Sequence, residues 1–159
     1  MREAEGSVAD AVVGEASGAE RMHSPVRRVL DTNIVLDLWV FEEPRAEALR
    51  LSVETGSTHW LATAAMREEL ARVLAYPQIV KRLTHRALPA DTVLGHFDRW
   101  AKLHPDAPKA EYACKDPDDQ KFIDLAVTHA AALHSKDAQV LCMKKRLERC
   151  GVALNPATT

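Results

Sequence analysis

Four carboxylates in this chain of 159 residues are placed where they could share a metal ion. Asp31 and Asp137 each follow a short apolar run, whereas Glu69 and Asp119 lie on helical segments that follow such runs. Carboxylates at the carboxyl ends of strands in one α/β sheet converge on a single crevice. Several negative charges in one crevice require a cation, and oxygen ligands favour a hard divalent ion such as Mg²⁺ or Mn²⁺. The pattern therefore predicts a metal site formed by Asp31, Glu69, Asp119 and Asp137.

Asp31 has two explanations that the sequence leaves open. It closes the apolar run Val26–Leu30, which is where an α/β fold places an active-site carboxylate. It also precedes residues 34–38, which have helical character, and Asp is favoured as a helix N-cap. The two explanations are equally strong when Asp31 is considered alone.

Glu69 is preferred over its neighbour Glu68 because of helical spacing. Glu68 has Arg72 four residues later, which is the spacing of a surface ion pair. Glu69 instead falls on the apolar face with Met66 and Val73. A carboxylate on that face must be paired or bound to metal, since burying it alone costs too much free energy.

The motif Asp-Pro-Asp-Asp at residues 116–119 is typical of a helix start. Asp116 would be the N-cap, Pro117 the first helical residue, and the following acids would lie in the first turn. These preferences explain the acids without any function. They do not explain which acid faces the core, and Asp119 is the best candidate because it precedes Phe122 and Ile123 by three and four residues.

Asp137 follows the apolar run that ends at Ser135. The Ser135 hydroxyl can donate or accept a hydrogen bond and so orient a neighbouring carboxylate. Asp137 is also a possible N-cap for the last helical segment. Each acid has a structural explanation of its own, but four acids at strand ends or on inner helix faces favour a shared site.

Short apolar runs alternate with helical segments along the chain, which predicts an α/β fold with a parallel sheet and helices on both faces. Residues 1–24 are rich in Ala, Gly, Glu and Ser, and we expect a disordered extension there, followed by one domain over residues 25–159. We expect strands at Val26–Leu30, His59–Ala62, around Glu111–Cys114, Ala132–Ser135 and Val152–Leu154. We expect helices over residues 34–38, 44–54, 63–76, 78–83, 91–103, 116–131 and 138–149.

The composition is that of one globular domain, with 47% apolar and 28% charged residues. Three cysteines without a Cys-x-x-Cys spacing favour neither a disulfide framework nor a zinc site, so we expect a reducing, cytoplasmic environment. No apolar stretch approaches the roughly 20 residues that cross a bilayer.

Basic residues gather apart from the acids, although the net charge is only -2. An acidic centre with a basic rim suits a metal-dependent enzyme that acts on a polyanion. For any single cluster, a solvated helix face is the simpler explanation. The residues we consider for contact with such a polyanion, which the resemblance described below identifies as RNA, are Lys81, Arg82, Lys136 and Lys144.

The ordered set of motifs resembles the PIN-domain family of metal-dependent ribonucleases. It is most similar to the branch that supplies the toxins of bacterial toxin–antitoxin pairs (PilT N-terminus-like). The resemblance covers about residues 27–155, and it is carried by Leu30-Asp31-Thr32-Asn33, by Glu69 within residues 67–74, by residues 116–122, and by Ser135-Lys136-Asp137.

The resemblance implies a three-layer α/β/α sandwich with a central parallel sheet of about five strands. It implies that Asp31, Glu69, Asp119 and Asp137 are the catalytic, metal-binding residues, with Asn33 and Ser135 as supporting polar residues. It further implies Mg²⁺ or Mn²⁺ as cofactor, RNA as substrate, an antitoxin protein as partner and a homodimer.

Two other functions compete with a ribonuclease. A haloacid-dehalogenase-like phosphatase needs a second Asp two residues after the first, where this chain has Asn33. A catalytically silent PIN-like scaffold that binds RNA or a protein stays open as the alternative.

Overall fold

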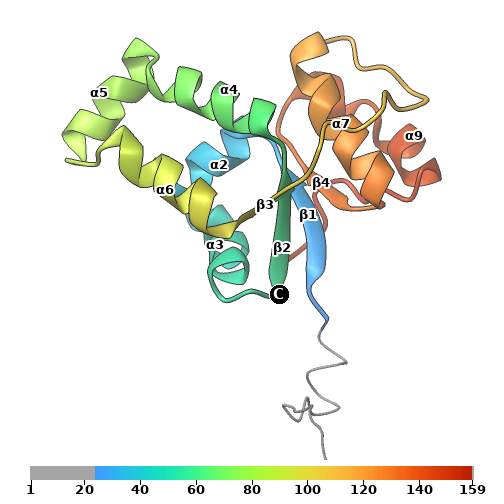
Figure 1. Cartoon of the computed structure of the whole chain (residues 1–159), viewed down its shortest axis with the longest axis horizontal. Helices are drawn as coiled ribbons and strands as arrows, with labels where there is room; N and C mark the ends of the chain where they lie inside the picture. The colour runs from blue at the N-terminus through green and yellow to red at the C-terminus, as the bar shows by residue number, and fades with distance from the viewer. Residues whose placement is uncertain (1–23, 159) are drawn as a thin grey trace, which may run out of the picture.

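The computed structural model describes residues 24–158. The predicted disordered extension, residues 1–24, therefore lies outside the described residues except for Ser24. The described chain forms a sheet with helices packed against both of its faces (Figure 1). The predicted α/β fold is confirmed.

The sheet has four parallel strands in the order β3-β2-β1-β4. They are β1 (Val26–Leu30), β2 (Thr58–Ala62), β3 (Ala101–Leu103) and β4 (Ala132–His134). In the central pairing Arg28 of β1 lies opposite both Trp60 of β2 and Ala132 of β4. Because β2 and β4 lie on opposite sides of β1, the chain leaves the carboxyl ends of β1 and β4 in different directions. Ligands of open α/β sheets bind at such a point.

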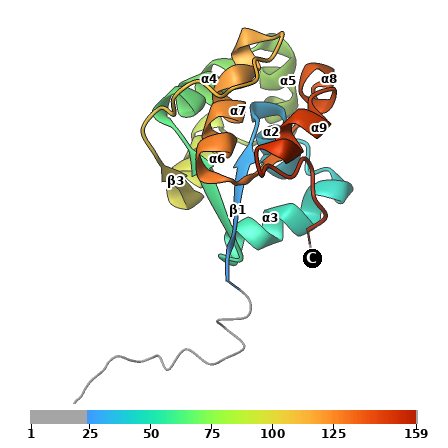
Figure 2. The same ribbon diagram turned by 90° about the vertical axis from the view of Figure 1, so that its right-hand side faces the viewer.

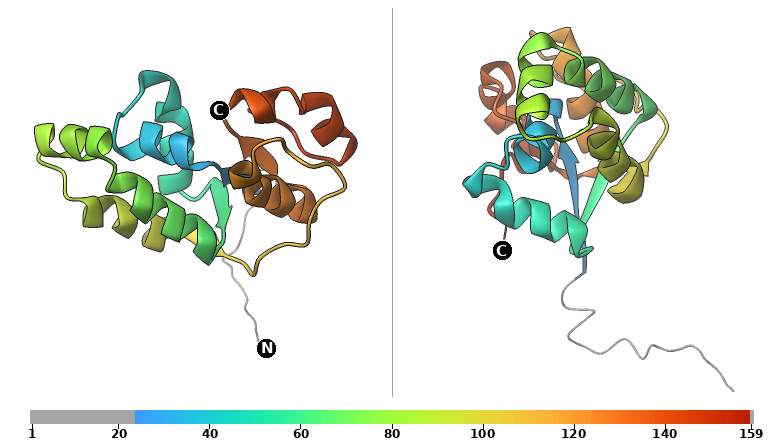
Figure 3. Two further views of the ribbon diagram at one scale, coloured as in Figure 1. Left: turned by 90° about the horizontal axis from the view of Figure 1, so that it is seen from above. Right: turned by 90° about the vertical axis from the view of Figure 1, so that its left-hand side faces the viewer.

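Two layers of helices cover the sheet, as Figure 3 shows from above. One layer contains α2 (Thr32–Trp39), the short 3-10 helix η1 (Pro44–Ala46), α3 (Glu47–Glu54), α4 (Ala64–Leu74), α5 (Pro77–His85) and α6 (Ala90–Trp100). The other, which faces the viewer in Figure 2, contains α7 (Pro117–His129), α8 (Ala138–Leu141) and α9 (Lys144–Arg149). The predicted three-layer arrangement is confirmed.

Apolar side chains fill the space between these layers. Val29 and Leu133, on adjacent strands, are fully buried. On the side of α2 and α6, the Trp60 ring stacks on Trp39 at 5.6 Å and meets the edge of Phe97 at 5.0 Å between ring centroids. This packing fixes the strands whose ends carry the acids, because a close-packed core tolerates little displacement.

The predicted strand boundaries were wrong in three places. The helix expected over residues 91–103 ends at Trp100, and Ala101–Leu103 form the edge strand β3 instead, because Ala101 pairs with Trp60. Ala, Lys and Leu all favour helices, so pairing with β2 outweighs the local preference of this segment. Pro105 disfavours a helix at the residue before it. In the described structure the expected strand Val152–Leu154 is reduced to one parallel bridge between Leu133 and Leu154, so the sheet has four strands rather than about five.

The strand expected around Glu111–Cys114 is absent from the described sheet because side chains of α7 satisfy that segment's backbone. The Asp124 carboxylate accepts from the Ala110 N–H at 2.8 Å, and the Gln120 amide oxygen accepts from the Cys114 N–H at 2.6 Å. These bonds hold the connection from β3 to α7 as an ordered loop. Within residues 24–158, no helix has the length and apolar character needed to cross a membrane.

Candidate metal centre

Asp31 is both a helix cap and a member of the site. One carboxylate oxygen accepts from the Ile34 N–H at 3.2 Å, which caps α2, and the other accepts from the Ser135 hydroxyl at 2.5 Å. The side chain is only 4% exposed. The two explanations left open by the sequence therefore both describe this residue. Burial raises the pKa of the Asp31 carboxyl, against the opposing effect of its hydrogen bonds with Ser135 and Ile34.

Ser135 links the ends of β1 and β4. While its hydroxyl donates to Asp31, the same oxygen accepts from the Asp137 N–H at 3.1 Å. The side-chain amide of Asn155 makes two hydrogen bonds with the Ser135 backbone. Its oxygen accepts from the Ser135 N–H at 2.9 Å, and its nitrogen donates to the Ser135 carbonyl at 2.8 Å. Sequence analysis did not find Asn155, because nothing local connects it to a position 20 residues earlier.

Asp116, Asp119 and Asp137 are brought together at this end of the sheet. Each offers one carboxylate oxygen, and the three oxygens lie within 4.8 Å of one another. Asp116 and Asp137 also cap helices, through the Asp118 N–H at 2.9 Å and the Gln139 N–H at 2.8 Å. The sequence predicts only a capping role for Asp116, and the structure adds its proximity to the other two acids. We call these three residues the aspartate cluster.

Asp119 has the most unfavourable electrostatic environment of the three. Its Oδ2 atom is buried and has no hydrogen-bond partner. Burial, followed by the charges of Asp137, Asp116 and Asp31, raises the pKa of the Asp119 carboxyl to about 7. A buried oxygen without a donor, beside two other carboxylates, fits a cation ligand. An all-oxygen set of this kind suits Mg²⁺ or Mn²⁺ better than softer metals.

Glu69 lies apart from the aspartate cluster and has its own partners. The Lys121 ammonium donates to one carboxylate oxygen at 2.5 Å, and the Thr32 hydroxyl donates to the other. Lys121 also donates to the Asp118 carbonyl at 2.7 Å and lies over the Phe122 ring at 4.9 Å. Sequence analysis predicted that Glu69 must be paired or metal-bound, but it did not identify Lys121 as the partner.

All four acids singled out from the sequence line one cleft of about 550 Å³. Asn33 also lines it, from the first turn of α2, and its exposed side chain makes no hydrogen bond with the described part of the chain. The far wall comes from the end of α4 and the start of α5. The lining residues that enter the argument below are Asp31, Asn33, Glu69, Arg72, Tyr76, Asp116, Asp119 and Asp137.

The four basic residues considered for RNA contact do not line this cleft. Lys81 and Arg82 are exposed on α5, and the Arg82 guanidinium lies 5.5 Å from the centre of the Phe41 ring. Lys144 pairs with Glu148 on α9, and Lys136 pairs with Asp37 at 2.6 Å. Their contact with RNA stays a prediction.

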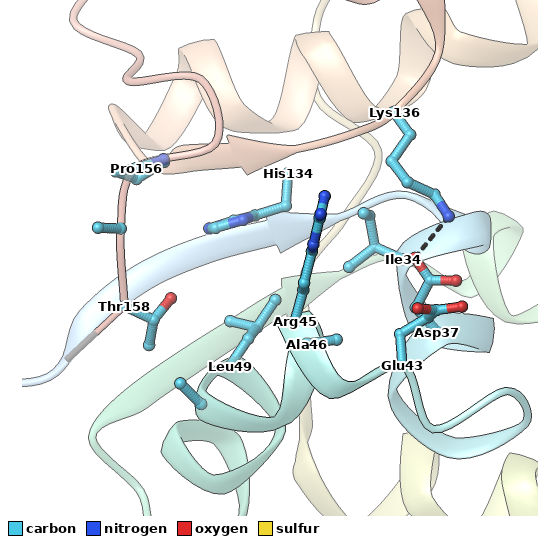
Figure 4. Close-up of a pocket in the computed structure, with 12 residues that line it drawn as sticks. Ile34, Asp37, Glu43, Arg45, Ala46, Leu49, His134, Lys136, Pro156 and Thr158 are labelled. Carbon is cyan, nitrogen blue, oxygen red and sulfur yellow. Dashed lines mark ion pairs between the residues drawn. The ribbon is translucent and has the colours of Figure 1, made fainter.

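A second cavity, of about 480 Å³, lies on the other side of α2 (Figure 4). The Lys136–Asp37 ion pair lies at one end, and Arg45 reaches between His134 and Ile34. His134 is buried, and the Arg28 guanidinium contacts its Nε2 atom at 2.9 Å. Burial and the charge of Arg28 lower the pKa of His134 to about 4, so this ring is neutral at neutral pH.

Two comparisons with known proteins bear on this geometry. The family model described as PIN domain matches residues 27–138, which include Asp31, Glu69 and the aspartate cluster. No curated protein matches the chain. PIN domains are generally nucleases that use divalent metal ions, which agrees with a cluster of carboxylates at the carboxyl ends of the strands.

The repulsion within the aspartate cluster predicts that Asp119→Asn stabilises the metal-free protein. Asp119 has a folded-state pKa of about 7, raised from 3.8, so folding favours its protonated form. The stability of the wild-type protein should therefore fall as the pH rises from about 4 to about 7 and level off above. The gain from Asp119→Asn should grow over that same range. Urea unfolding in EDTA at pH 5 and pH 8 measures it.

Glu68→Gln, which removes an exposed charge one residue from Glu69, serves as the control and should change stability by less than about 0.5 kcal/mol. A metal-free Asp119→Asn protein that is less stable than wild type at pH 8 would contradict the electrostatic account. Added Mn²⁺ should raise the unfolding midpoint of the wild-type protein more than that of the variant.

The Glu69–Lys121 pair predicts energetic coupling between these residues. Lys121→Met leaves a partly buried carboxylate with one donor fewer, and Glu69→Gln leaves the ammonium without its anion. Each change alone should lower the free energy of unfolding by about 1–3 kcal/mol. The double variant should lose clearly less than the sum, as measured by urea unfolding of all four proteins in EDTA. Additive losses would show that the pair contributes nothing.

Proposed function

This chain belongs to the PIN-domain family, and we propose that it is a metal-dependent ribonuclease that hydrolyses RNA phosphodiester bonds with Mg²⁺ or Mn²⁺. The observation that carries the proposal is the aspartate cluster, with its buried and unsatisfied Asp119 oxygen, near the carboxyl ends of the paired strands β1 and β4. RNA as the substrate rests on the resemblance of the sequence motifs to ribonucleases of this family.

The aspartate cluster would hold the ion, since its three carboxylate oxygens lie close enough together to bind one ion. A divalent ion supplies two effects when bound, lowering the pKa of water and neutralising charge on the scissile phosphate. In the metal-free protein, burial and neighbouring charges raise the pKa of Asp119 to about 7. A bound cation would oppose that shift and favour the ionised carboxylate.

Asp31 and Ser135 would act as positioning residues. Both Asp31 oxygens accept hydrogen bonds within the protein, so this carboxylate fixes Ser135, and Ser135 fixes the backbone of Asp137. Partners of this kind orient metal ligands, and their loss costs about 10- to 100-fold in metal affinity or activity. Glu69, neutralised by Lys121, would bind water or the ion only after a change of partner.

The proposal predicts metal-dependent cleavage of a labelled mixed-sequence RNA. The wild-type protein should cut with Mn²⁺ or Mg²⁺ and stop in EDTA. Asp119→Asn and Asp116→Asn should cut undetectably, Ser135→Ala should be slower by about 10- to 100-fold, and Glu68→Gln should match wild type. A DNA of the same sequence distinguishes a ribonuclease from a general nuclease.

A well-folded protein that binds the RNA but does not cut it with either metal would favour the silent scaffold instead. Full activity of Asp119→Asn would place the chemistry elsewhere. Circular dichroism of each variant separates loss of function from loss of fold.

We further propose that the chain is the toxin of a bacterial toxin–antitoxin pair. This part of the proposal rests on the similarity of the motifs around Asp31, Asp119 and Asp137 to that branch of the family. Such a protein should arrest growth when its expression is induced in bacteria without an antitoxin. Asp119→Asn, produced at the same level, should leave growth unchanged. Equal growth of cells expressing either protein would exclude the toxin role while leaving the nuclease proposal intact.

A further inference from the structure

One wall of the cleft carries a basic and an aromatic side chain instead of acids. Arg72, near the end of α4, and Tyr76, at the junction with α5, line the same cleft as the aspartate cluster. Tyr76 is 47% exposed. The other large exposed apolar residues of the described chain, which do not line this cleft, are Val26, Leu51, Val80, Leu103 and Leu141.

Local structure gives no reason for an aromatic residue at this position. Tyr76 is the N-cap of α5, and its side chain makes no capping hydrogen bond. Ser, Thr, Asp or Asn at an N-cap would stabilise the helix, and Tyr is not among the favoured residues. The backbone is nonetheless held firmly: the Tyr76 N–H donates to the Val73 carbonyl at 3.0 Å, and the Tyr76 carbonyl accepts from the Val80 N–H at 2.8 Å. The ring is therefore presented to solvent from a fixed point.

Arg72 is free to bind a ligand. The sequence predicted an ion pair with Glu68, and that prediction was wrong: within residues 24–158 the Arg72 side chain makes no ion pair and no hydrogen bond. Arg67, one turn earlier on α4, shows the contrast, since its guanidinium forms two bonds with Asp98 at 2.7 and 2.9 Å. The only arginine of α4 that lines the acidic cleft is thus the one left without a partner.

An exposed aromatic ring and an unpaired guanidinium, both lining a cleft with a cluster of metal-binding acids, match the chemistry of an unpaired nucleotide. Aromatic side chains stack on nucleobases, and arginine binds the neighbouring phosphate. Bases inside a duplex are covered on both faces, so they offer no surface to such a ring. We propose that Tyr76 and Arg72 form a subsite for one unpaired nucleotide of a single-stranded RNA, the base lying on Tyr76 and an adjacent phosphate on Arg72. This inference rests on the proposed ribonuclease function.

Binding of a fluorescein-labelled single-stranded RNA to the full chain tests the subsite. Every protein in this experiment carries Asp119→Asn so that the RNA stays intact, and the chain with that change alone is the parent protein. Tyr76→Leu keeps an apolar side chain but removes the ring, and it should weaken binding by about 10-fold, within the range measured for loss of one stacked base. Tyr76→Phe should bind within about 2-fold of the parent, since the stacking face is retained. The same RNA annealed to its complement should bind more weakly than the single strand and should be insensitive to Tyr76→Leu.

Arg72→Ala should weaken binding and lower the slope of log affinity against log salt concentration by about 0.7, the value for one phosphate contact on a single strand. Arg45→Ala, an exposed arginine beside the second cavity, is the matched control and should leave the affinity unchanged. An RNA carrying 2-aminopurine reports stacking directly, because its fluorescence should fall on binding to the parent protein and not on binding to Tyr76→Leu.

Equal binding by Tyr76→Leu and the parent would overturn the subsite, as would equal losses from Arg72→Ala and Arg45→Ala. Either result, together with metal-dependent cleavage by the wild-type protein, would reject the subsite and leave the ribonuclease function standing. A parent protein that binds no RNA, with a wild-type protein that cuts none, would reject both.

Discussion

Mutual repulsion among carboxylates is the constraint around which this structure is arranged. Three aspartate oxygens lie within 4.8 Å of one another. Such a grouping is unfavourable unless backbone N–H donors or a cation offset the repulsion between the negative charges. The fold opposes it with helix N-termini. Asp31, Asp116 and Asp137 each cap a helix, so the hydrogen bond that starts the helix also holds the carboxylate at the mouth of the sheet. Asp119 has no such bond on its buried oxygen, and its pKa rises accordingly.

The distribution of cations explains why the aspartate cluster, rather than Glu69, is the candidate for metal. Lys121 neutralises Glu69, whereas the buried Arg28 guanidinium contacts His134. Within residues 24–158, Asp116, Asp119 and Asp137 form no ion pair with a protein cation. Oxygen ligands with that charge are the natural environment of a hard divalent ion.

The cleft joins two kinds of recognition. One wall carries the acids, held by strand ends and helix caps, and the other carries Tyr76 and Arg72 at a helix junction. Both walls fall within the matched PIN-domain region, residues 27–138. Asn155, which holds Ser135 and so the junction of β1 and β4, lies outside it. Asn155 therefore stabilises, from outside the matched region, a site whose acids all lie within it.

The sequence alone determined the α/β class, most of the helices and strands, and the four acids that line the cleft, because periodicity and capping are local properties. It distinguished Glu69, which lines the cleft, from Glu68, which does not, whereas Asp118 and Asp119 both line it. Tertiary structure decided the rest. Ala101–Leu103 form a strand because they pair with β2. Asp116 lies close to Asp137 as well as to Asp119. Lys121 pairs with Glu69, 52 residues away, and Asn155 pairs with Ser135, 20 residues away. Such contacts depend on strand order and on how helices pack, and no short stretch of sequence encodes either.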